Sequence, residues 1–328
     1  MAAEDHDSRL RRGAVKKGKV PEISCVIPVY NEAKVLDTLV MQVSGAMEKA
    51  GKEYEIVFVD DGSGDTTWEI LKRIAGSSDR VRAIRFTRNF GKESAIQAGL
   101  QQARGKAAVI MDADLQHPPH LLPGMIDLWE KSGYEVVEGV KTERQRETFL
   151  NRAGSMLFYQ TLKIVSGFDL RKDTDFKLLD RKVIEAYLSL NEKGRFFRTL
   201  IPYLGFKTAR IPFTPDERGN GSPRFSFLKR FSLAVTAITS FSSIPLHVVT
   251  LLGLFTFLFS LLLGAHTVYV KLSGKAVEGF TTVILVLLFI GSILMIALGI
   301  IGEYIARIFE EVKNRPSFVI AEITDSEQ

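Results

Sequence analysis

The sequence predicts an α/β domain built on a mostly parallel sheet, followed by amphipathic helices at a membrane surface and by a hairpin of two transmembrane helices. The domain is predicted because short β-branched runs alternate with helix-like segments from Ile23 to about Val140. This alternation is typical of parallel strands joined by right-handed helical crossovers. The hairpin is predicted because residues 247–270 and 283–302 are almost purely apolar, and each stretch is long enough to cross a bilayer.

The elements of the domain follow in chain order. Strands are expected at ISCVIPV, YEIVFVD, VRAIRF, AAVIMDA and YEVVEGV, with helices near 33–50, 66–74, 94–103 and 121–132. Past Lys141 the pattern predicts a helix near 149–164 and a strand near 207–212, so we place the domain at residues 22–224. The single cysteine, Cys25, lies in the first strand run, which excludes a disulfide scaffold and a cysteine-based metal site.

Residues 1–21 are predicted to form a disordered basic arm. Six basic side chains fall within residues 9–19, with few apolar residues and no aromatic ones. The arm has no apolar core of the kind that a signal peptide needs. Because it belongs to a chain with membrane spans, we expect it to bind anionic lipid headgroups rather than nucleic acid.

The C-terminal part is predicted to lie on and in a membrane. The apolar segment before the first span carries Lys229 and Arg230 near one end, which favours interfacial helices over the alternative of a buried core helix. Lysine and arginine outside the two spans outnumber those in the short link between them, so the positive-inside rule places the domain in the cytoplasm. We therefore expect a multi-pass protein of the plasma (inner) membrane. The segments are 225–246 (interfacial helices), 247–305 (hairpin, with spans 247–270 and 282–304) and 306–328 (cytoplasmic tail).

Polar side chains follow the predicted parallel strands at the edge where such sheets bind ligands. These side chains are those of Tyr30–Glu32, Asp60–Asp61, Lys92, Asp112 and Asp114. Two neighbouring carboxylates repel each other unless a cation lies beside them. Oxygen ligands suit Mg²⁺ or Mn²⁺, and Gln116 adds a carbonyl oxygen. The alternative is that Asp112 and Asp114 only cap a turn, which the Pro118–Pro119 pair stiffens.

Four motifs carry a resemblance to a known family: VIPVYNE (26–32), VFVDDGSGD (57–65), RNFGKESAIQAGLQQARG (88–105) and VIMDADLQHPP (109–119). Together they resemble the GT-A domain of family 2 glycosyltransferases. They are most similar to the polyisoprenyl-phosphate branch, which includes dolichyl-phosphate mannose synthases and bactoprenol glucosyltransferases. SFSSIPL before the spans and EEVKNRP after them are similar to the membrane-bound members. The resemblance covers roughly residues 22–320.

The resemblance implies a role for each motif residue. The nucleotide is lined by Pro28, Tyr30, Glu32 and Asp60, and the other substrate contacts are Lys92, Asp112, Gln116, Lys177 and Gly221. The divalent metal on the donor diphosphate is held by Asp112, Asp114 and Gln116. The catalytic residues are Asp114, Asp175, Arg218 and Arg224, of which Asp175 faces the acceptor as a base or as a positioning group. The chain departs from the family pattern at Thr174, Lys177, Ser222 and Pro223.

The resemblance implies transfer of glucose from UDP-glucose to a polyprenyl (undecaprenyl) phosphate, with inversion and with Mg²⁺ or Mn²⁺. UDP-N-acetylglucosamine and GDP-mannose are alternative donors, and an inactive membrane-anchored nucleotide-binding protein is the alternative of another class. The expected partners are the nucleotide sugar, the lipid phosphate, the bilayer and further copies of the chain, for example in a tetramer. No nucleic acid is expected.

Overall fold

The computed structural model describes residues 20–142, 174–190, 192, 195–214, 244–274, 279–313 and 315–324. They divide between two compact units, one with the sheet and one with the two long apolar helices. The predicted arm, the helix near 149–164 and the basic loop with Arg218, Gly221 and Arg224 lie outside the described residues. Of the predicted interfacial segment only residues 244–246 are described, and they begin a long helix.

The elements of the first unit agree closely with those expected. In order they are β1 (Ile23–Val29), α2 (Leu36–Ala50), β2 (Tyr54–Asp60), α3 (Thr67–Ser77), β3 (Val81–Phe86), α4 (Lys92–Gln102), β4 (Ala107–Ile110), the 3-10 turn η1 (Pro119–Leu121), α5 (Leu122–Ser132), β5 (Val136–Lys141), β6 (Lys177–Asp180), α7 (Arg181–Ser189), α8 (Phe197–Tyr203), β7 (Thr208–Phe213) and β8 (Ile320–Thr324). Each predicted strand that lies in the described part is present.

The strands form one sheet in the order β7-β5-β6-β4-β1-β2-β3-β8. Its centre, β4-β1-β2-β3, is parallel throughout, as the alternation of strands and helices predicts. β6 runs antiparallel to both β4 and β5, and β8 runs antiparallel to β3. The predicted mostly parallel α/β fold is therefore confirmed, with two antiparallel strands that the sequence analysis did not contain.

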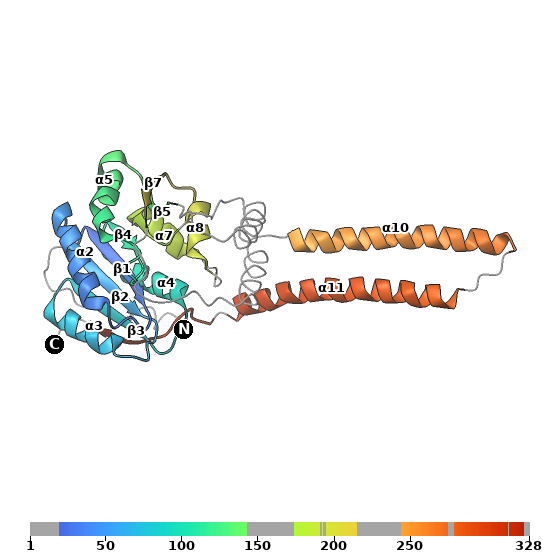
Figure 1. The fold of residues 1–328 in the computed structure, drawn as a ribbon, viewed down its shortest axis with the longest axis horizontal. Helices are drawn as coiled ribbons and strands as arrows, with labels where there is room; N and C mark the ends of the chain where they lie inside the picture. Colours follow the sequence, from blue (N-terminus) through green and yellow to red (C-terminus); the bar gives the residue numbers. More distant parts are fainter. Residues whose placement is uncertain are drawn as a thin grey trace, which may run out of the picture. The chain divides into compact units, whose positions relative to one another are not determined.

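Helices cover both faces of the sheet (Figure 1). One face packs against α2, α3 and α5, and the other packs against α4, α7 and α8. The two faces divide the residues of β1 between them, because Cys25 and Ile27 point into one core and Val26 into the other. α4 lies unusually close to β1, since a Cβ on Gly99 would be 2.3 Å from Val26 Cγ1. This contact fixes the position of α4 and of its first residue, Lys92.

Two strands differ from expectation for identifiable reasons. β4 ends at Ile110 instead of reaching Ala113, because the chain turns at Asp112 to begin the loop before the Pro118–Pro119 pair. β8 comes from the segment that was expected to be only a tail. It pairs with the free edge of β3 and so covers an edge strand that would otherwise expose unpaired backbone groups.

The second unit contains α10 (Ile244–Leu272) and α11 (Phe280–Val312). Within them, Leu246–Val270 and Val286–Ala306 are long and apolar enough to cross a membrane. The rings of Phe259 in α10 and Phe289 in α11 lie 6.2 Å apart, so the two helices contact each other. α11 is longer than the predicted span and continues to Val312, beyond the apolar window.

Candidate active site

The pairing of β4 with β6 brings together two carboxylates that are far apart in the sequence. Ile110 lies opposite Lys177 in this antiparallel pair. Asp112 follows the end of β4, and Asp175 precedes the start of β6, so both reach the same edge of the sheet. Asp175 is only 3% exposed. Register therefore places this buried carboxylate beside the predicted metal ligand.

A tight loop between β3 and α4 delivers Lys92 to the same place. Both carboxylate oxygens of Asp61 accept backbone N–H groups of this loop, from Phe90 at 2.6 Å and from Gly91 at 2.9 Å. Gly91 has φ +96°, a conformation that favours glycine. The neighbouring loop requires Gly62, because a Cβ there would lie 2.5 Å from the Arg88 carbonyl carbon. The end of β2 thus holds the loop that positions Lys92.

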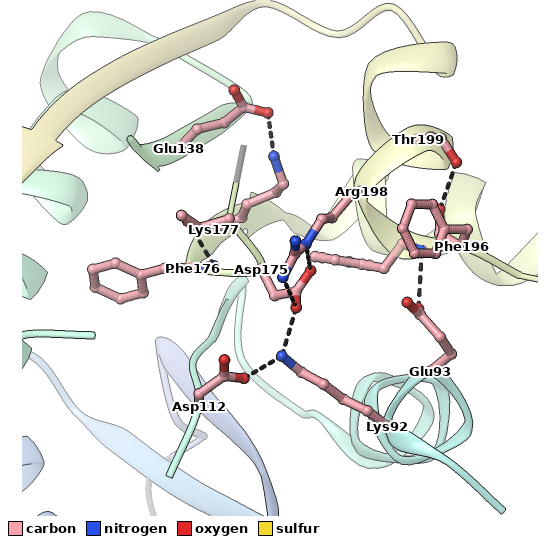
Figure 2. A network of polar contacts seen from close by, with 12 residues as sticks. Lys92, Glu93, Asp112, Glu138, Asp175, Phe176, Lys177, Phe196, Arg198 and Thr199 are labelled. Atoms are coloured by element: carbon pink, nitrogen blue, oxygen red, sulfur yellow. Dashed lines mark hydrogen bonds and ion pairs between the residues drawn. The ribbon is translucent and has the colours of Figure 1, made fainter. Parts of the chain in front are cut away.

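Four charged side chains form one network at this edge (Figure 2). The Lys92 ammonium bridges the two carboxylates, with an ion pair to Asp112 and a 2.5 Å hydrogen bond to Asp175 Oδ2. Arg198, the second residue of α8, grips Asp175 from the other side. Its Nε donates to Asp175 Oδ1 at 2.7 Å, and its Nη2 donates to Asp175 Oδ2 at 2.9 Å. This two-point contact is the geometry that holds a carboxylate most firmly.

The network keeps Asp175 ionised. Burial by itself disfavours its charge, but the hydrogen bonds from Arg198 and the charge of Lys92 outweigh burial and lower the pKa of Asp175 well below its usual range. Burial by itself would lower the pKa of Lys92, but the charges of Asp112 and Asp175 outweigh burial and raise this pKa. Asp175 therefore carries a permanent negative charge at neutral pH, with both oxygens already engaged by cations.

Glu93 provides a second connection between α4 and α8. Its Oε2 accepts the backbone N–H of Phe197, the first residue of α8, at 2.9 Å. Burial, with a contribution from the charge of Asp175, raises the pKa of Glu93 to about 7. The starts of the two helices are thus linked by adjacent residues of each: Lys92 and Glu93 on α4, and Phe197 and Arg198 on α8.

The turn after β4 holds the predicted metal ligands. Leu115 adopts φ +60°, which is unusual for a branched side chain and marks a constrained turn. Asp114 Oδ1 accepts the N–H of Gln116 at 3.1 Å. The N–H of Asp112 donates to His117 Nδ1 at 2.8 Å, and the His117 ring stacks on Phe176 at 5.1 Å. His117 thus supports the turn from behind, and burial lowers its pKa.

The side chains near the turn after β4 are oxygen donors of the type that a divalent ion prefers. Within the described residues no three His, Cys, Asp or Glu side chains are placed to hold an ion by themselves. Burial raises the pKa of Glu32, and the negative charges of Asp114, Asp65 and Asp112 raise it further. The carboxylates of three different loops therefore lie close enough to repel one another. Carboxylate and carbonyl oxygens are the ligands that suit Mg²⁺ or Mn²⁺.

The residues predicted to contact the nucleotide lie at the ends of β1 and β2. Pro28 is buried inside β1, whereas Tyr30 is 48% exposed at its end. The N–H of Glu32 donates to Thr67 Oγ1 at 3.0 Å. Asp60 is fully buried, and its Oδ1 accepts the N–H of Ser63 at 3.0 Å. Its Oδ2 lies 3.5 Å from Arg85 Nε and, in the part of the chain that the structure describes, accepts no hydrogen bond.

Lys177 points away from the network. Its side chain is completely buried and forms an ion pair with Glu138 (Figure 2). The other carboxylate oxygen of Glu138 lies 3.4 Å from Arg210 Nε. As a strand residue it alternates with Phe176, so the two side chains take opposite faces. The structure thus gives Lys177 a buried contact with Glu138, and its contact with substrate stays a prediction.

A groove of about 800 Å³ lies on the other side of the metal-ligand turn. It is lined by α2 residues such as Met41 and Gly45, by Pro118 and Pro119, and at its rim by Asp114 and Gln116. Its walls are mainly apolar and do not include Lys92, Asp112 or Asp175. The charged network thus contains Lys92, Asp112 and Asp175, whereas the groove is lined by Asp114 and Gln116 of the adjoining turn.

The structure brings together Lys92, Asp112 and Asp175, with Asp114 and Gln116 on the adjoining turn. The sequence analysis did not identify Arg198 or Glu93, and it placed Asp61 at this edge of the sheet without giving it a role. The signal for Asp61 was present, since it follows a strand beside Asp60, but the signal for Arg198 was weak because RFFRTL contains two arginines with no motif around them.

The fold and the site define a class: an α/β protein whose parallel strands end in a cluster of carboxylates and cations, with an apolar helical hairpin after it. Comparisons narrow this class. The model described as "Glycosyl transferase family 2" matches residues 24–188, and "GtrB C-terminal hairpin" matches residues 244–308. The chain belongs to glycosyltransferase family 2, as its motifs predicted, and its catalytic domain has the GT-A-type fold.

Relatives with similarity along nearly the whole chain support the assignment. An uncharacterized glycosyltransferase, YkcC of Bacillus subtilis, is 38% identical over 301 residues, which are 91% of this chain and 93% of the relative. The protein sll0501 of Synechocystis, also described as an uncharacterized glycosyltransferase, is 34% identical over 92% of this chain and 95% of its own length. The SfII prophage-derived bactoprenol glucosyl transferase of Shigella flexneri is 36% identical over 91% of this chain and 97% of its own length.

Proposed function

We propose that this glycosyltransferase moves glucose from UDP-glucose to a polyprenyl phosphate with inversion at the anomeric carbon. Similarity to bactoprenol glucosyl transferases over nearly the whole chain supports the reaction. The apolar hairpin supports a lipid acceptor, because the acceptor phosphate lies at headgroup level. UDP-N-acetylglucosamine and GDP-mannose are the alternative donors.

The catalytic proposal rests on one observation: Lys92 and Arg198 both form ion pairs with the Asp175 carboxylate. A general base needs a free oxygen and a pKa near the working pH. Asp175 has neither, because Lys92 and Arg198 occupy both oxygens and lower its pKa. A phosphate monoester is already ionised at neutral pH and needs little help to attack. Of the two roles, general base and positioning group, we therefore assign Asp175 the second. In this role it aligns two cations that face the phosphates.

Asp112, Asp114 and Gln116 would hold a divalent ion, Mg²⁺ or Mn²⁺, and this ion would neutralise charge that develops on the diphosphate leaving group. Lys92, next to Asp112, adds a fixed positive charge to the same edge. The basic-loop residues Arg218, Gly221 and Arg224 are proposed to reach the phosphates.

The nucleotide is proposed to lie at the ends of β1 and β2. Tyr30 offers an exposed ring for stacking on the base, and Pro28 and Glu32 flank it in the sequence. Asp60, at the end of β2, is proposed to belong to the same site. With its domain in the cytoplasm and the hairpin in the inner membrane, the enzyme would meet soluble donor and lipid acceptor on one side. Assembly into a homo-oligomer remains a prediction.

The proposal is tested with the purified full-length chain in lipid nanodiscs, Mg²⁺, polyprenyl phosphate and labelled UDP-glucose, UDP-N-acetylglucosamine and GDP-mannose. We expect transfer from UDP-glucose and an inverted anomeric configuration by NMR of the product. Asp114→Ala should lower the rate at least about 100-fold, whereas Asp127→Ala, which removes an exposed carboxylate on α5, should not. Failure of all three donors would overturn the enzyme proposal, and full activity of Asp114→Ala would overturn the metal site.

A further inference from the structure

The final described segment of the chain, residues 316–324, is firmly attached to the sheet. We call it the C-terminal strap. Its strand β8 pairs with β3, with Ile323 opposite Ile84 and Glu322 opposite Arg85. Trp68 Nε1 also donates to Glu322 Oε2 at 3.0 Å. These contacts anchor the second half of the strap and cover the edge of β3.

The first half of the strap makes a different set of contacts, with residues on both sides of the loop that precedes α4. The Phe318 ring stacks on Phe86 at 5.0 Å, and Phe86 meets the edge of Phe90 at 5.8 Å. The hydroxyl of Ser94 donates to both the carbonyl of Phe90, at 3.2 Å, and the carbonyl of Ser317, at 3.1 Å. The strap thus joins both ends of the segment that contains Lys92.

These contacts continue directly into the charged network. Phe90 and Gly91 donate their N–H groups to Asp61, and the next residue is Lys92, whose ammonium bridges Asp112 and Asp175. Covering the edge of β3 would require only residues 320–324. The contacts of Phe318 with β3 and of Ser317 with α4, on either side of the loop, require a second explanation.

We propose that the C-terminal strap positions the loop of residues 87–92, and through it Lys92, for the glycosyl transfer. This inference rests on the proposed function and deepens it, since it assigns a positioning role to residues that follow the second membrane helix in the chain. The strap makes no contact with substrate in this role. Phe318 and Ser94 act through the loop and are positioning residues.

The test compares Phe318→Ala and Ser94→Ala with Val319→Ala in the full-length chain. Val319 belongs to the strap, but its side chain is 46% exposed, and its carbonyl still accepts the N–H of Thr87 after substitution. Amide hydrogen exchange reports the loop through the N–H groups of Phe90 and Gly91. Steady-state kinetics report kcat and KM separately.

We expect Phe318→Ala to speed exchange at Phe90 and Gly91 at least about 10-fold and to lower kcat by about 10-fold, as misplaced catalytic groups do. Val319→Ala should change neither quantity. Ser94→Ala should also speed exchange and lower kcat. If Phe318→Ala does not fold, Ser94→Ala alone tests the role of the strap. Normal exchange and normal kcat in both variants would overturn the proposal. Because exchange is measured without substrate, it still decides the role of the strap if no donor supports transfer.

Discussion

At the scale of single residues, the contacts of Asp175 determine which chemical role its carboxylate can have. Its carboxylate is conspicuous in the sequence, but its partners Lys92 and Arg198 come from two other elements. A carboxylate that accepts hydrogen bonds from two cations stays ionised and cannot take up a proton near neutral pH. The contribution that we propose for it is therefore alignment of the cations.

Arg198 supplies the planar two-point contact, and lysine cannot reproduce it. We expect Arg198→Lys to lower kcat by about 10- to 100-fold with a smaller change in KM for the nucleotide sugar. Added guanidinium should partly restore the activity of Arg198→Ala, because a small planar cation can occupy the vacated position. Steady-state kinetics of Arg198→Ala with and without guanidinium measure this recovery of activity. Equal activity of Arg198→Lys and the parent chain would contradict the assignment.

Glu93 is expected to make folding depend on pH. Its folded-state pKa of about 7 exceeds the ordinary value of 4.5, so the protonated form is favoured in the folded chain. Stability is therefore present at low pH and is lost as pH rises from about 4.5 to 7. Glu93→Gln, which keeps an acceptor for the N–H of Phe197, should reduce this loss by up to about 3 kcal/mol. Urea unfolding of the parent and variant at pH 5 and pH 8 checks the difference, and identical pH profiles would refute it.

At the scale of elements, α4 is placed by its close approach to β1. Gly99 allows this approach, and the helix begins at Lys92. The same helix contacts β2 and α7, so a shift of α4 would move the ammonium relative to Asp112 and Asp175. Packing on the sheet thus determines the geometry of the site.

Gly99→Ala should destabilise the fold by about 1–3 kcal/mol, because its Cβ would overlap Val26. Gly45→Ala is the matched control: it lies inside α2, where a Cβ would meet nothing within 4 Å, and alanine should stabilise that helix by up to about 1 kcal/mol. Thermal unfolding of both variants tests the pair. Similar melting temperatures for the two variants would disprove the packing argument.

At the scale of the whole molecule, the chain leaves the sheet unit for two apolar helices and then contributes β8 to the same sheet. If both helices cross the membrane, the two ends of the hairpin must lie on one side, and the link near Ser273 must lie on the other.

Ser273→Cys is therefore expected to react with a membrane-impermeant maleimide in intact cells, whereas Ser132→Cys, at the exposed end of α5, should react only after lysis. The native Cys25 is buried, which keeps background labelling low. Labelling of Ser132→Cys in intact cells would reverse the proposed orientation.

The sequence by itself determined the parallel centre of the sheet, the positions of most helices, the apolar hairpin and the family. These features follow from local periodicity and contiguous motifs, which need no knowledge of distant contacts. Lys92 and Asp112 were recognised for the same reason, since each lies in a contiguous motif at the end of a predicted strand.

Only the tertiary structure decided which charges meet. The pairing of β6 between β4 and β5 brings Asp175 to Asp112, and the packing of α8 on α4 and α7 brings Arg198 to Asp175. It also turned Lys177 toward Glu138 and made the tail a strand of the sheet. These outcomes depend on the register and packing of segments tens to hundreds of residues apart, and local sequence patterns do not encode such pairings.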